Sequence, residues 1–410
     1  LKSLHSQYPD ITYLYSIGKS VQRRDLLVLA ISTDPSQHTP GKPEFKFIGN
    51  IHGNEVTGRE LLLNLAESLL MNYGRNIYLT KIVNMTRIHI LPSMNPDGHK
   101  RAIEGDYNGV KGRFNTNGVD LNRNFPHGRS HGNHLGRRIQ PETFAVIQWS
   151  IPFVLSASLH DGSLLVNFPY DDYINERRFT SHTGDHELFI RLAYSYARAH
   201  EFMWKKGPRC LYDFYDDPQL GITNGAEWYP VAGGMQDWNY LNTNCFEVTI
   251  EMNCQKYTFE NRLQKLWNEH KFAMIGFISQ VHNTIHGFIT DSVTGEGIGN
   301  VEIRITNEAK VIKSSKYGDY WRLINPGLYQ MTFQRPFYKT ERKIIEIKNE
   351  QSSLFLNISL QRLNRRFQNA DQNALNLRSA VPKSTISIIV PFSIVLSYHS
   401  IFRILNLLME

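Results

Sequence analysis

Residues 45–70 read as a strand, a polar turn and a helix, and this segment sets the expectations for the rest of the chain. Residues 45–51 (FKFIGNI) are mostly apolar and strand-like, and residues 60–70 (ELLLNLAESLL) carry an apolar stripe at helical spacing. His52 and Glu55 stand in the turn between them, where glycines permit a sharp change of direction. Because open α/β sheets place ligand sites at the ends of strands, this turn is a candidate site.

A histidine and a glutamate in one loop are a weak signal, since both side chains are ordinary on a solvated surface. A catalytic zinc site takes three protein ligands from His and Asp/Glu and keeps one position open. His160 supplies a third ligand, because it directly follows the strand-like run 153–159 (FVLSASL). Such a set leaves a coordinated water acidic enough to attack a carbonyl. The residues therefore predict that His52, Glu55 and His160 bind Zn²⁺.

Strands and helices alternate through the first 285 residues, which predicts an α/β fold with a mixed central sheet flanked by helices. The expected strands lie near residues 13–18, 26–31, 45–51, 87–92, 153–159 and 246–252. The expected helices lie near residues 60–70, 141–150, 185–199 and 259–281.

The strand expected at 246–252 (FEVTIEM) carries acidic residues at alternate positions. The alternation puts Glu247, Thr249 and Glu251 on one face of the strand. A carboxylate on a buried strand is unfavourable unless it is paired or lies beside a metal ion. Glu247 and Glu251 are therefore expected to have a partner or to lie beside a metal ion.

Residues 99–130 are polar and show no apolar period, and a loop of this length inside a compact domain is usually functional or disordered. The loop contains Arg113 and Arg123. Two solvated surface arginines are the simplest interpretation. They gain a role only if an anionic substrate must be held, because the guanidinium group pairs with a carboxylate through two parallel hydrogen bonds.

The pattern changes near residue 285. Short alternating strands separated by turn signals predict a small all-β sandwich over residues 284–362, without a chemical constellation of its own. A polar linker (363–385) and an apolar tail (386–410) follow. The tail is slightly short for a spanning helix of ~20 apolar residues. A spanning helix, a lipid-anchor signal with Ser379 and Ala380 upstream, and an amphipathic tail remain open, with membrane attachment expected.

Composition narrows the class of protein. With 41% hydrophobic and 20% charged residues the chain is globular, and a net charge of +7 without a basic–aromatic module argues against nucleic-acid binding. Three cysteines without a Cys-x-x-Cys pair argue against a cysteine zinc site. Glycosylation acceptors at Asn84 and Asn357 fit a glycoprotein of the secretory pathway. The chain begins at Leu1, so either a leader has been removed or the sequence is a fragment.

Five motifs in order give the chain a specific resemblance. They are HGNE at 52–55, NPDG at 95–98, GVDLNRNFP at 118–126, GGMQDWNY at 233–240 and EVTIE at 247–251. With these motifs the chain resembles the zinc metallocarboxypeptidases, and within them the carboxypeptidase N/E/M/D branch, over about residues 1–362. The resemblance implies a catalytic domain over residues 1–283 and a transthyretin-like sandwich over residues 284–362.

The resemblance also implies the catalytic roles. His52, Glu55 and His160 match the ligands of one Zn²⁺ ion. Glu251 matches the general base and acid that takes a proton from the zinc-bound water and gives it to the leaving amine. Arg113 matches the arginine that polarises the scissile carbonyl and stabilises the oxyanion.

The same resemblance implies how substrate is held. Asn122 and Arg123 match the pair that binds the terminal carboxylate. Asp171, with Gln236 as its polar partner, matches the acidic selector for a C-terminal Arg or Lys side chain. The implied activity is therefore removal of C-terminal basic residues from peptides and proteins, by a monomer that is extracellular or on the cell surface.

Two further implications concern a tyrosine and the cysteines. Tyr229 matches the mobile tyrosine over the site and is preferred to Tyr240, which belongs to a structural segment. The resemblance suggests a Cys210–Cys254 disulfide, with Cys245 buried and free.

Asp161, directly after His160, departs from the branch, which usually has glycine there. A carboxylate at this place can bind the metal, alter its water or point away. The alternative function is thus a catalytically impaired peptide-binding module on the same fold, although the presence of Glu251 argues against it. A third hypothesis is a metal-dependent deacylase or deglutamylase on the same fold. It predicts a basic residue at position 171, where this chain has Asp171.

Overall fold

A mixed sheet of eight strands, in the order β1-β2-β4-β3-β5-β8-β6-β7, forms the centre of the fold. The computed structural model describes residues 1–126, 138–172, 181–205, 210, 219–306, 308, 310–349 and 353–363. The strands are β1 (Thr12–Lys19), β2 (Asp25–Ile31), β3 (Glu44–Gly49), β4 (Arg87–Leu91), β5 (Phe153–His160), β6 (Ser163–Phe168), β7 (Ile222–Asn224) and β8 (Phe246–Asn253). The strands expected near 13–18 and 26–31 form the antiparallel pair β1–β2, whereas β4, β3, β5 and β8 run parallel. The α/β prediction is confirmed.

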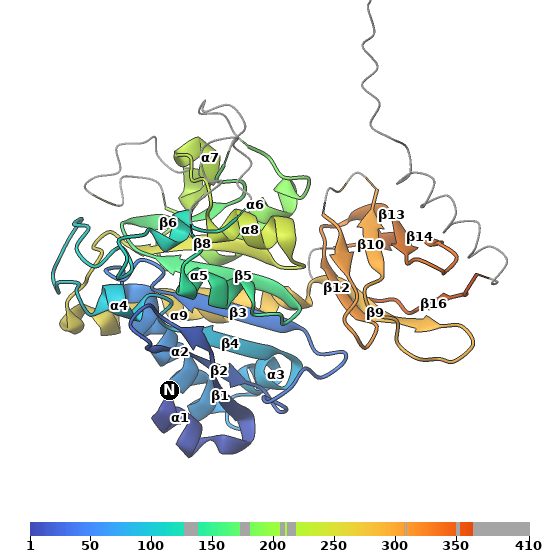
Figure 1. Ribbon diagram of the computed structural model, residues 1–410, viewed down its shortest axis with the longest axis horizontal. Coiled ribbons are helices and arrows are strands. Elements are labelled where there is room, and N and C mark those ends of the chain that lie inside the picture. Colours follow the sequence, from blue (N-terminus) through green and yellow to red (C-terminus); the bar gives the residue numbers. More distant parts are fainter. Residues whose placement is uncertain are drawn as a thin grey trace, which may run out of the picture. The chain divides into compact units, whose positions relative to one another are not determined.

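Helices cover both faces of this sheet (Figure 1). One face packs against α2 (Thr57–Asn72), α3 (Ile77–Met85), α6 (His186–Ala197) and α9 (Glu260–Ser279). The other face packs against α5 (Pro141–Ile147) and α8 (Met235–Asn242). The shorter helices are α1 (Lys2–Gln7), α4 (Pro96–His99) and α7 (Gly225–Trp228).

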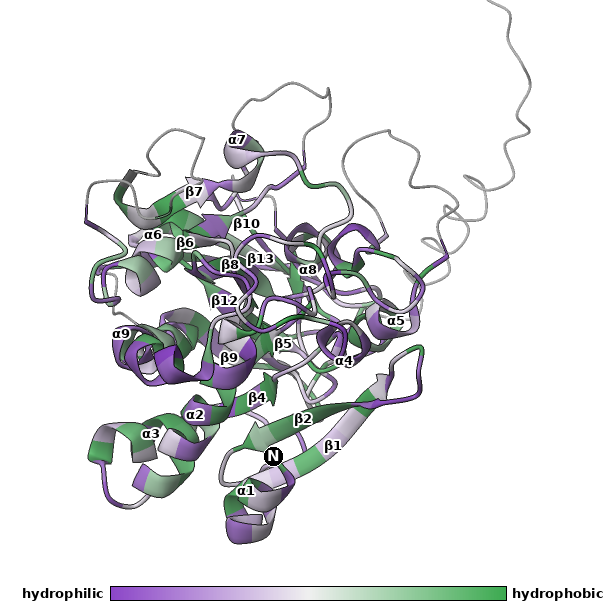
Figure 2. Cartoon of the chain, turned by 90° about the vertical axis from the view of Figure 1, so that its left-hand side faces the viewer, coloured by the Kyte–Doolittle hydropathy of each residue, from purple (hydrophilic) through white to green (hydrophobic). Residues whose placement is uncertain are grey.

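Strand alternation divides the side chains between the two apolar cores. In β3, Phe45 and Phe47 enter the core under α2 and α9, whereas Ile48 enters the core under α5 and α8. Figure 2 shows the consequence, with β2 coloured largely hydrophobic and α9 carrying both colours, as an amphipathic helix does. Both sheet faces therefore carry an apolar core, although buried polar side chains such as Lys46, Ser156 and Glu247 also lie within the strands.

The strands of the parallel block place the predicted site residues at one edge of the sheet. In the β5–β8 ladder His160 lies opposite Glu251, and in the β3–β5 ladder Gly49 lies opposite Leu159. The loop after β3, the end of β5 and the end of β8 therefore meet, as the sequence predicted from strand ends.

A second β region follows α9, and it confirms the predicted transthyretin-like β-sandwich. Its sheets have the orders β11-β10-β13-β14 and β12-β9-β15, with β16 pairing β9. The strands are β9 (Thr284–Asp291), β10 (Glu302–Ile305), β11 (Ile312–Lys313), β12 (Asp319–Leu323), β13 (Gly327–Gln334), β14 (Glu341–Ile347), β15 (Leu354–Phe355) and β16 (Ile358–Leu360). Ile289, Ile303, Met331 and Phe333 are among the side chains of its separate core.

The three cysteines are arranged as the resemblance implied. A disulfide joins Cys210 to Cys254, and Cys245 is a buried free thiol. Residues 1–362 form one compact unit. The linker beyond Leu363 and the apolar tail 386–410 lie outside the described residues. No helix among the described residues has the length and apolar character needed to cross a bilayer.

Candidate active site

The side chain of Asn50 fixes the conformation of the turn after β3. Asn50, at φ +59°, donates from its side-chain amide to the carbonyl oxygens of His52 (3.0 Å), Gly53 (3.0 Å) and Glu55 (2.9 Å). A Cβ on Gly53 would lie 2.3 Å from the backbone nitrogen of His99, so only glycine fits. The turn therefore presents His52 and Glu55 in a fixed arrangement.

His52, Glu55 and His160 each offer one ligand atom, and these atoms lie within 4.8 Å of one another. Glu55 Oε2 is 2.9 Å from His52 Nδ1 and 3.0 Å from His160 Nδ1. All three residues are buried. Two imidazole nitrogens and a carboxylate oxygen are the donor set of a catalytic zinc site, so the residues present fit the ion.

The outer nitrogen of each imidazole has its own partner, which fixes the nitrogen that faces the ligand centre. His52 Nε2 lies 3.1 Å from Asp120 Oδ1, and His160 Nε2 lies 3.1 Å from Ser158 Oγ. Burial disfavours the charged form of Asp120, but the positive charges of His52 and Arg113 hold its pKa well below the usual range. Sequence reasoning missed Asp120 and Ser158, although Asp120 lies inside the motif at 118–126.

A cavity of about 140 Å³ opens beside the ligand atoms. Every predicted site residue except Gln236 lines it, so the structure brings together nearly all of the predicted constellation. The lining includes His52, Glu55, Arg113, Asn122, Arg123, His160, Asp171, Tyr229, Glu251 and Lys256.

Glu251 and Arg113 both line the cavity but come from different segments. Glu251 belongs to β8, and Arg113 belongs to the long loop at 99–130. Glu251 is almost fully buried, and this burial raises its pKa to about 7, where a carboxyl group exchanges protons readily near neutral pH. Arg113 lies 3.2 Å (Nη1) from Glu55 Oε1 and 3.0 Å (Nη2) from Asp120 Oδ2. A proton-transfer group and a guanidinium group thus flank the ligand atoms.

Asn122 and Arg123 lie together on the short 3₁₀ turn at 121–123. Asn122 Oδ1 accepts a hydrogen bond from the backbone nitrogen of Met235 (3.0 Å), and this contact turns the Nδ2 donor the other way. Arg123 Nη1 donates to the carbonyl of Asn122 (3.0 Å) and its side chain lines the cavity. Both side chains can donate to an anion.

Asp171 is buried at the far wall of the cavity, and burial raises its pKa to about 7. Its Oδ1 atom accepts hydrogen bonds from Asn167 (2.9 Å) and Gln236 (3.0 Å). Among the described residues, Gln236 Oε1 has no hydrogen-bond partner. A Cβ on Gly225 would lie only 1.7 Å from Asp171 Oδ1, so glycine keeps this wall open. Gln236 therefore joins the site through Asp171.

The structure separates the two candidate tyrosines. Tyr229 lines the cavity and is 36% exposed, whereas Tyr240 is buried and donates from its hydroxyl to Asp185 Oδ2 (2.7 Å). Tyr229 is thus the one with access to a ligand.

Asp161 lines the cavity, and one of its carboxyl oxygens contacts a helix. Its Oδ2 atom accepts from the backbone nitrogen of Thr57 (2.8 Å), the first residue of α2, and burial, together with the charge of Glu55, raises the pKa of Asp161 well above its usual range. Its backbone nitrogen donates to Glu55 Oε2 (3.4 Å). Asp161 is not one of the three residues whose ligand atoms converge in the described part of the chain.

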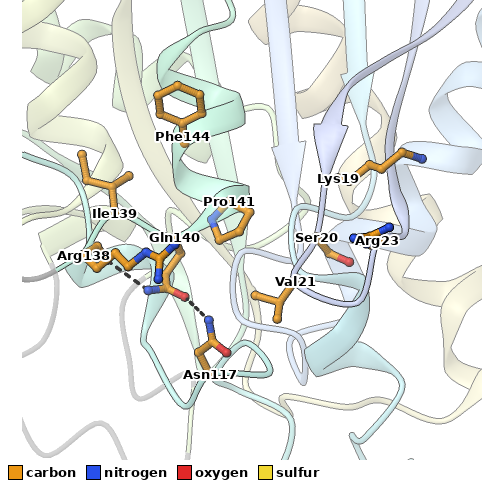
Figure 3. Close-up of a pocket in the computed structure, with 10 residues that line it drawn as sticks. All are labelled: Lys19, Ser20, Val21, Arg23, Asn117, Arg138, Ile139, Gln140, Pro141 and Phe144. Atoms are coloured by element: carbon orange, nitrogen blue, oxygen red, sulfur yellow. Dashed lines mark hydrogen bonds between the residues drawn. The ribbon is translucent and has the colours of Figure 1, made fainter.

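A wider groove of about 930 Å³ lies between the end of the β1–β2 hairpin and α5 (Figure 3). Lys19, Arg23 and Arg138 bring positive charge to it, and Ile139 and Phe144 give an apolar wall. Among the described residues, its lining contains none of the predicted site residues and no histidine or carboxylate. Although this groove is larger than the cavity beside His52, Glu55 and His160, it is therefore not the candidate active site.

Comparison with known protein families agrees with this geometry. Residues 1–273 match the family described as zinc carboxypeptidase, and residues 284–361 match the carboxypeptidase regulatory-like domain.

Curated relatives and solved structures give the same result. The chain is 48% identical over 354 residues to mouse carboxypeptidase D, covering 85% of this chain and 25% of that protein. It is 44% identical over 367 residues to the mouse carboxypeptidase N catalytic chain, covering 82% and 79%. The crystal structure of thrombin activatable fibrinolysis inhibitor superposes with a TM-score of 0.52 at 22% identity, covering 68% of this chain and 71% of that one, which supports the fold. The chain spans about a quarter of the length of the carboxypeptidase D relatives it matches.

Proposed function

Since the chain belongs to the zinc carboxypeptidase family, we propose that it is a zinc-dependent exopeptidase that removes C-terminal Arg or Lys from peptides and proteins. The observation that carries the proposal is one cavity that holds the convergent His52, Glu55 and His160 together with Glu251 and the buried acid Asp171.

The ligand set would hold Zn²⁺ through His52 Nδ1, Glu55 Oε2 and His160 Nδ1. When bound, the ion polarises a carbonyl oxygen and lowers the pKa of a water molecule. Glu251 accepts the proton of the attacking water and returns it to the leaving amine, and a pKa near 7 suits both directions of transfer. Arg113 donates to the carbonyl oxygen as negative charge develops there.

Exopeptidase action follows from the donors on the other side of the cavity. Asn122 and Arg123 bind the free terminal carboxylate, which only the last residue of a substrate carries. Asp171 and the unpaired Gln236 Oε1 accept hydrogen bonds from a guanidinium or ammonium group at the bottom of the pocket. Tyr229, the exposed tyrosine of the cavity, covers the bound residue.

The alternative, an impaired peptide-binding module, rests on Asp161. The contact between Asp161 Oδ2 and the start of α2 argues against it, because this oxygen has a structural partner, whereas Oδ1 has none among the described residues. The names of the relatives, carboxypeptidase D and carboxypeptidase N, also favour an active enzyme.

We further propose that the protein acts as a monomer outside the cell or at its surface, attached to the membrane through its C-terminal segment. The Cys210–Cys254 disulfide favours an oxidising compartment. The acceptor residues Asn84 and Asn357 are both exposed, as glycosylation requires. A shift in gel mobility after N-glycosidase treatment of protein from secretory cells checks this part.

The test of the activity is hydrolysis of two blocked dipeptides, one ending in Arg and one in Phe, with zinc and then with a chelator. We expect chelator-sensitive release of Arg and little release of Phe. Glu251→Gln is the matched variant, because it keeps the side-chain volume and removes the proton acceptor. Zinc-bound protein that releases neither residue would favour the binding module, and a Glu251→Gln protein with wild-type activity would refute the mechanism.

A further inference from the structure

Lys256 belongs to the loop that follows β8. Its backbone and its side chain both contact the turn that carries His52 and Glu55. The carbonyl oxygen of Lys256 accepts from the backbone nitrogen of Val56 (3.1 Å), directly after Glu55. The Nζ atom donates to Glu55 Oε1 (2.7 Å) and to the carbonyl oxygen of Asp161 (3.2 Å), directly after His160. One side chain thus reaches the neighbourhood of two ligands.

The two oxygens of Glu55 have different surroundings. Oε2 faces the Nδ1 atoms of His52 and His160, whereas Oε1 faces cations. Among the described residues, the cations at Oε1 are Lys256 at 2.7 Å and Arg113 at 3.2 Å. A hydrogen bond between charged groups at the shorter distance is the stronger one, so Lys256 chiefly sets how the carboxylate is turned.

The site is shaped to admit this lysine. A Cβ on Gly162, at φ +126°, would lie 3.1 Å from Lys256 Nζ and 3.4 Å from its Cε atom, tighter than is usual. The Lys256 side chain is only 17% exposed, and it lines the cavity. Its position is therefore built into the pocket rather than being that of a surface lysine.

Arg113 has a second task, because its guanidinium group must reach the substrate carbonyl while it also contacts Glu55 and Asp120. If Arg113 were the only cation at Glu55 Oε1, that movement would leave a buried carboxylate oxygen without a partner, which is unfavourable. Lys256 stays at Oε1 when Arg113 moves.

We propose that Lys256 is a positioning residue that fixes Glu55 as a ligand through Oε2 and frees Arg113 to contact substrate. The inference rests on the proposed function. It goes beyond that function by assigning a task to a residue outside the ligand, proton-transfer and substrate-holding groups.

The test measures Zn²⁺ binding without substrate, by competition with a coloured chelator. Lys256→Met removes the charge and keeps most of the side-chain length. We expect it to bind Zn²⁺ about 10–100-fold more weakly than wild type, the usual effect of losing a residue that orients a ligand. Lys256→Arg restores most of the affinity. Lys265→Met, the same change at a side chain 71% exposed on α9, is the control and keeps wild-type affinity.

A second readout separates positioning from general loss of structure. At saturating Zn²⁺, Lys256→Met lowers kcat on the Arg-terminated dipeptide with little change in KM, because Arg113 then stays at Glu55 while the substrate contacts are intact. Lys256→Gln, which keeps a donor without the charge, serves if the Met variant does not fold.

Unchanged Zn²⁺ affinity in the folded charge-removed variant overturns the inference. So does a raised KM with wild-type Zn²⁺ affinity, because that result makes Lys256 a substrate contact. Wild-type protein that binds no Zn²⁺ refutes the proposed function itself, so the two failures are distinguishable.

Discussion

At the scale of single residues, the proposed substrate preference rests on Asp171. It is buried, it accepts from Asn167 and Gln236 through one oxygen, and Gly225 leaves room beside it. Asp171 is a buried carboxyl group of the cavity lining that does not belong to the convergent His52, Glu55 and His160 set. In the proposed function, Asp171 supplies the counter-charge for the side chain of the departing residue.

Asp171→Asn is expected to remove the preference for basic residues. Loss of one partner from a buried charge pair costs about 2–5 kcal/mol, so kcat/KM for the Arg-terminated dipeptide should fall by roughly 30-fold or more. Activity on the Phe-terminated dipeptide is the internal control and should not fall in parallel. Equal losses on both substrates would show general damage to the site, and an unchanged preference would place the selector elsewhere.

The residues found by sequence reasoning differ from those missed in where their partners lie. His52 and Glu55 share one turn and His160 follows a strand, so pattern and strand-end geometry identify them, whereas the role of Glu251 follows from the resemblance of its motif at 247–251. Lys256 acts on Glu55 across 201 positions of sequence. A lysine in a loop carries no local signal for such a contact, and only the folded sheet brings the two together.

At the scale of elements, strands and helices with a clear local pattern were predicted, and those that depend on distant partners were not. Long apolar periods predicted β3, β5, β8, α2 and α9. The segments α3, β6 and β14 were not predicted. In β14 (ERKIIEI) charged residues interrupt the alternation, and in α3 nine residues are too few for a clear helical period. Their structure comes from packing and from partner strands, as in the seven-residue pairing of β13 with β14.

The close approach of α2 to β5 gives a prediction about two helical glycines. A Cβ on Gly58 would lie 2.5 Å from Leu159 Cβ, whereas a Cβ on Gly276 in α9 meets nothing within 4 Å. Gly58→Ala should lower the free energy of unfolding by about 1–3 kcal/mol through overpacking. Gly276→Ala, the matched control, should raise it by up to about 1 kcal/mol, because alanine favours helix. Urea unfolding measures both.

The outcome also bears on the site, because Leu159 directly precedes His160. If Gly58→Ala proved as stable as Gly276→Ala, the contact between α2 and β5 would be looser than the structure shows. A destabilised Gly58→Ala with weakened Zn²⁺ binding would instead show that this contact helps to place the third ligand.

At the scale of the whole molecule, buried ionic groups join the catalytic sheet to the β-sandwich. Arg322 of β12 donates to Asp185 Oδ1 (2.5 Å), which precedes α6. His38, in the loop before β3, lies 2.6 Å (Nδ1) from Glu44 Oε1 and 2.9 Å (Nε2) from Asp319 Oδ2 of β12. One imidazole thus bridges a carboxylate from each part, and it can donate to both only when it is protonated.

This bridge predicts how stability depends on pH. Burial alone would lower the pKa of His38, but its hydrogen bonds to Asp319 and Glu44 outweigh burial and raise the pKa from 6.5 to about 9. Because the folded-state pKa is the higher one, the contribution is fully present below pH 6.5 and is lost as the pH rises through 9. Its size is on the order of 3 kcal/mol. His38→Gln keeps polar contacts but cannot titrate in this range, so its free energy of unfolding should fall less steeply between pH 6.5 and 9 than that of wild type. Parallel declines in urea unfolding would show that the bridge carries no proton-linked stability, since the other alkaline titrations are common to both proteins.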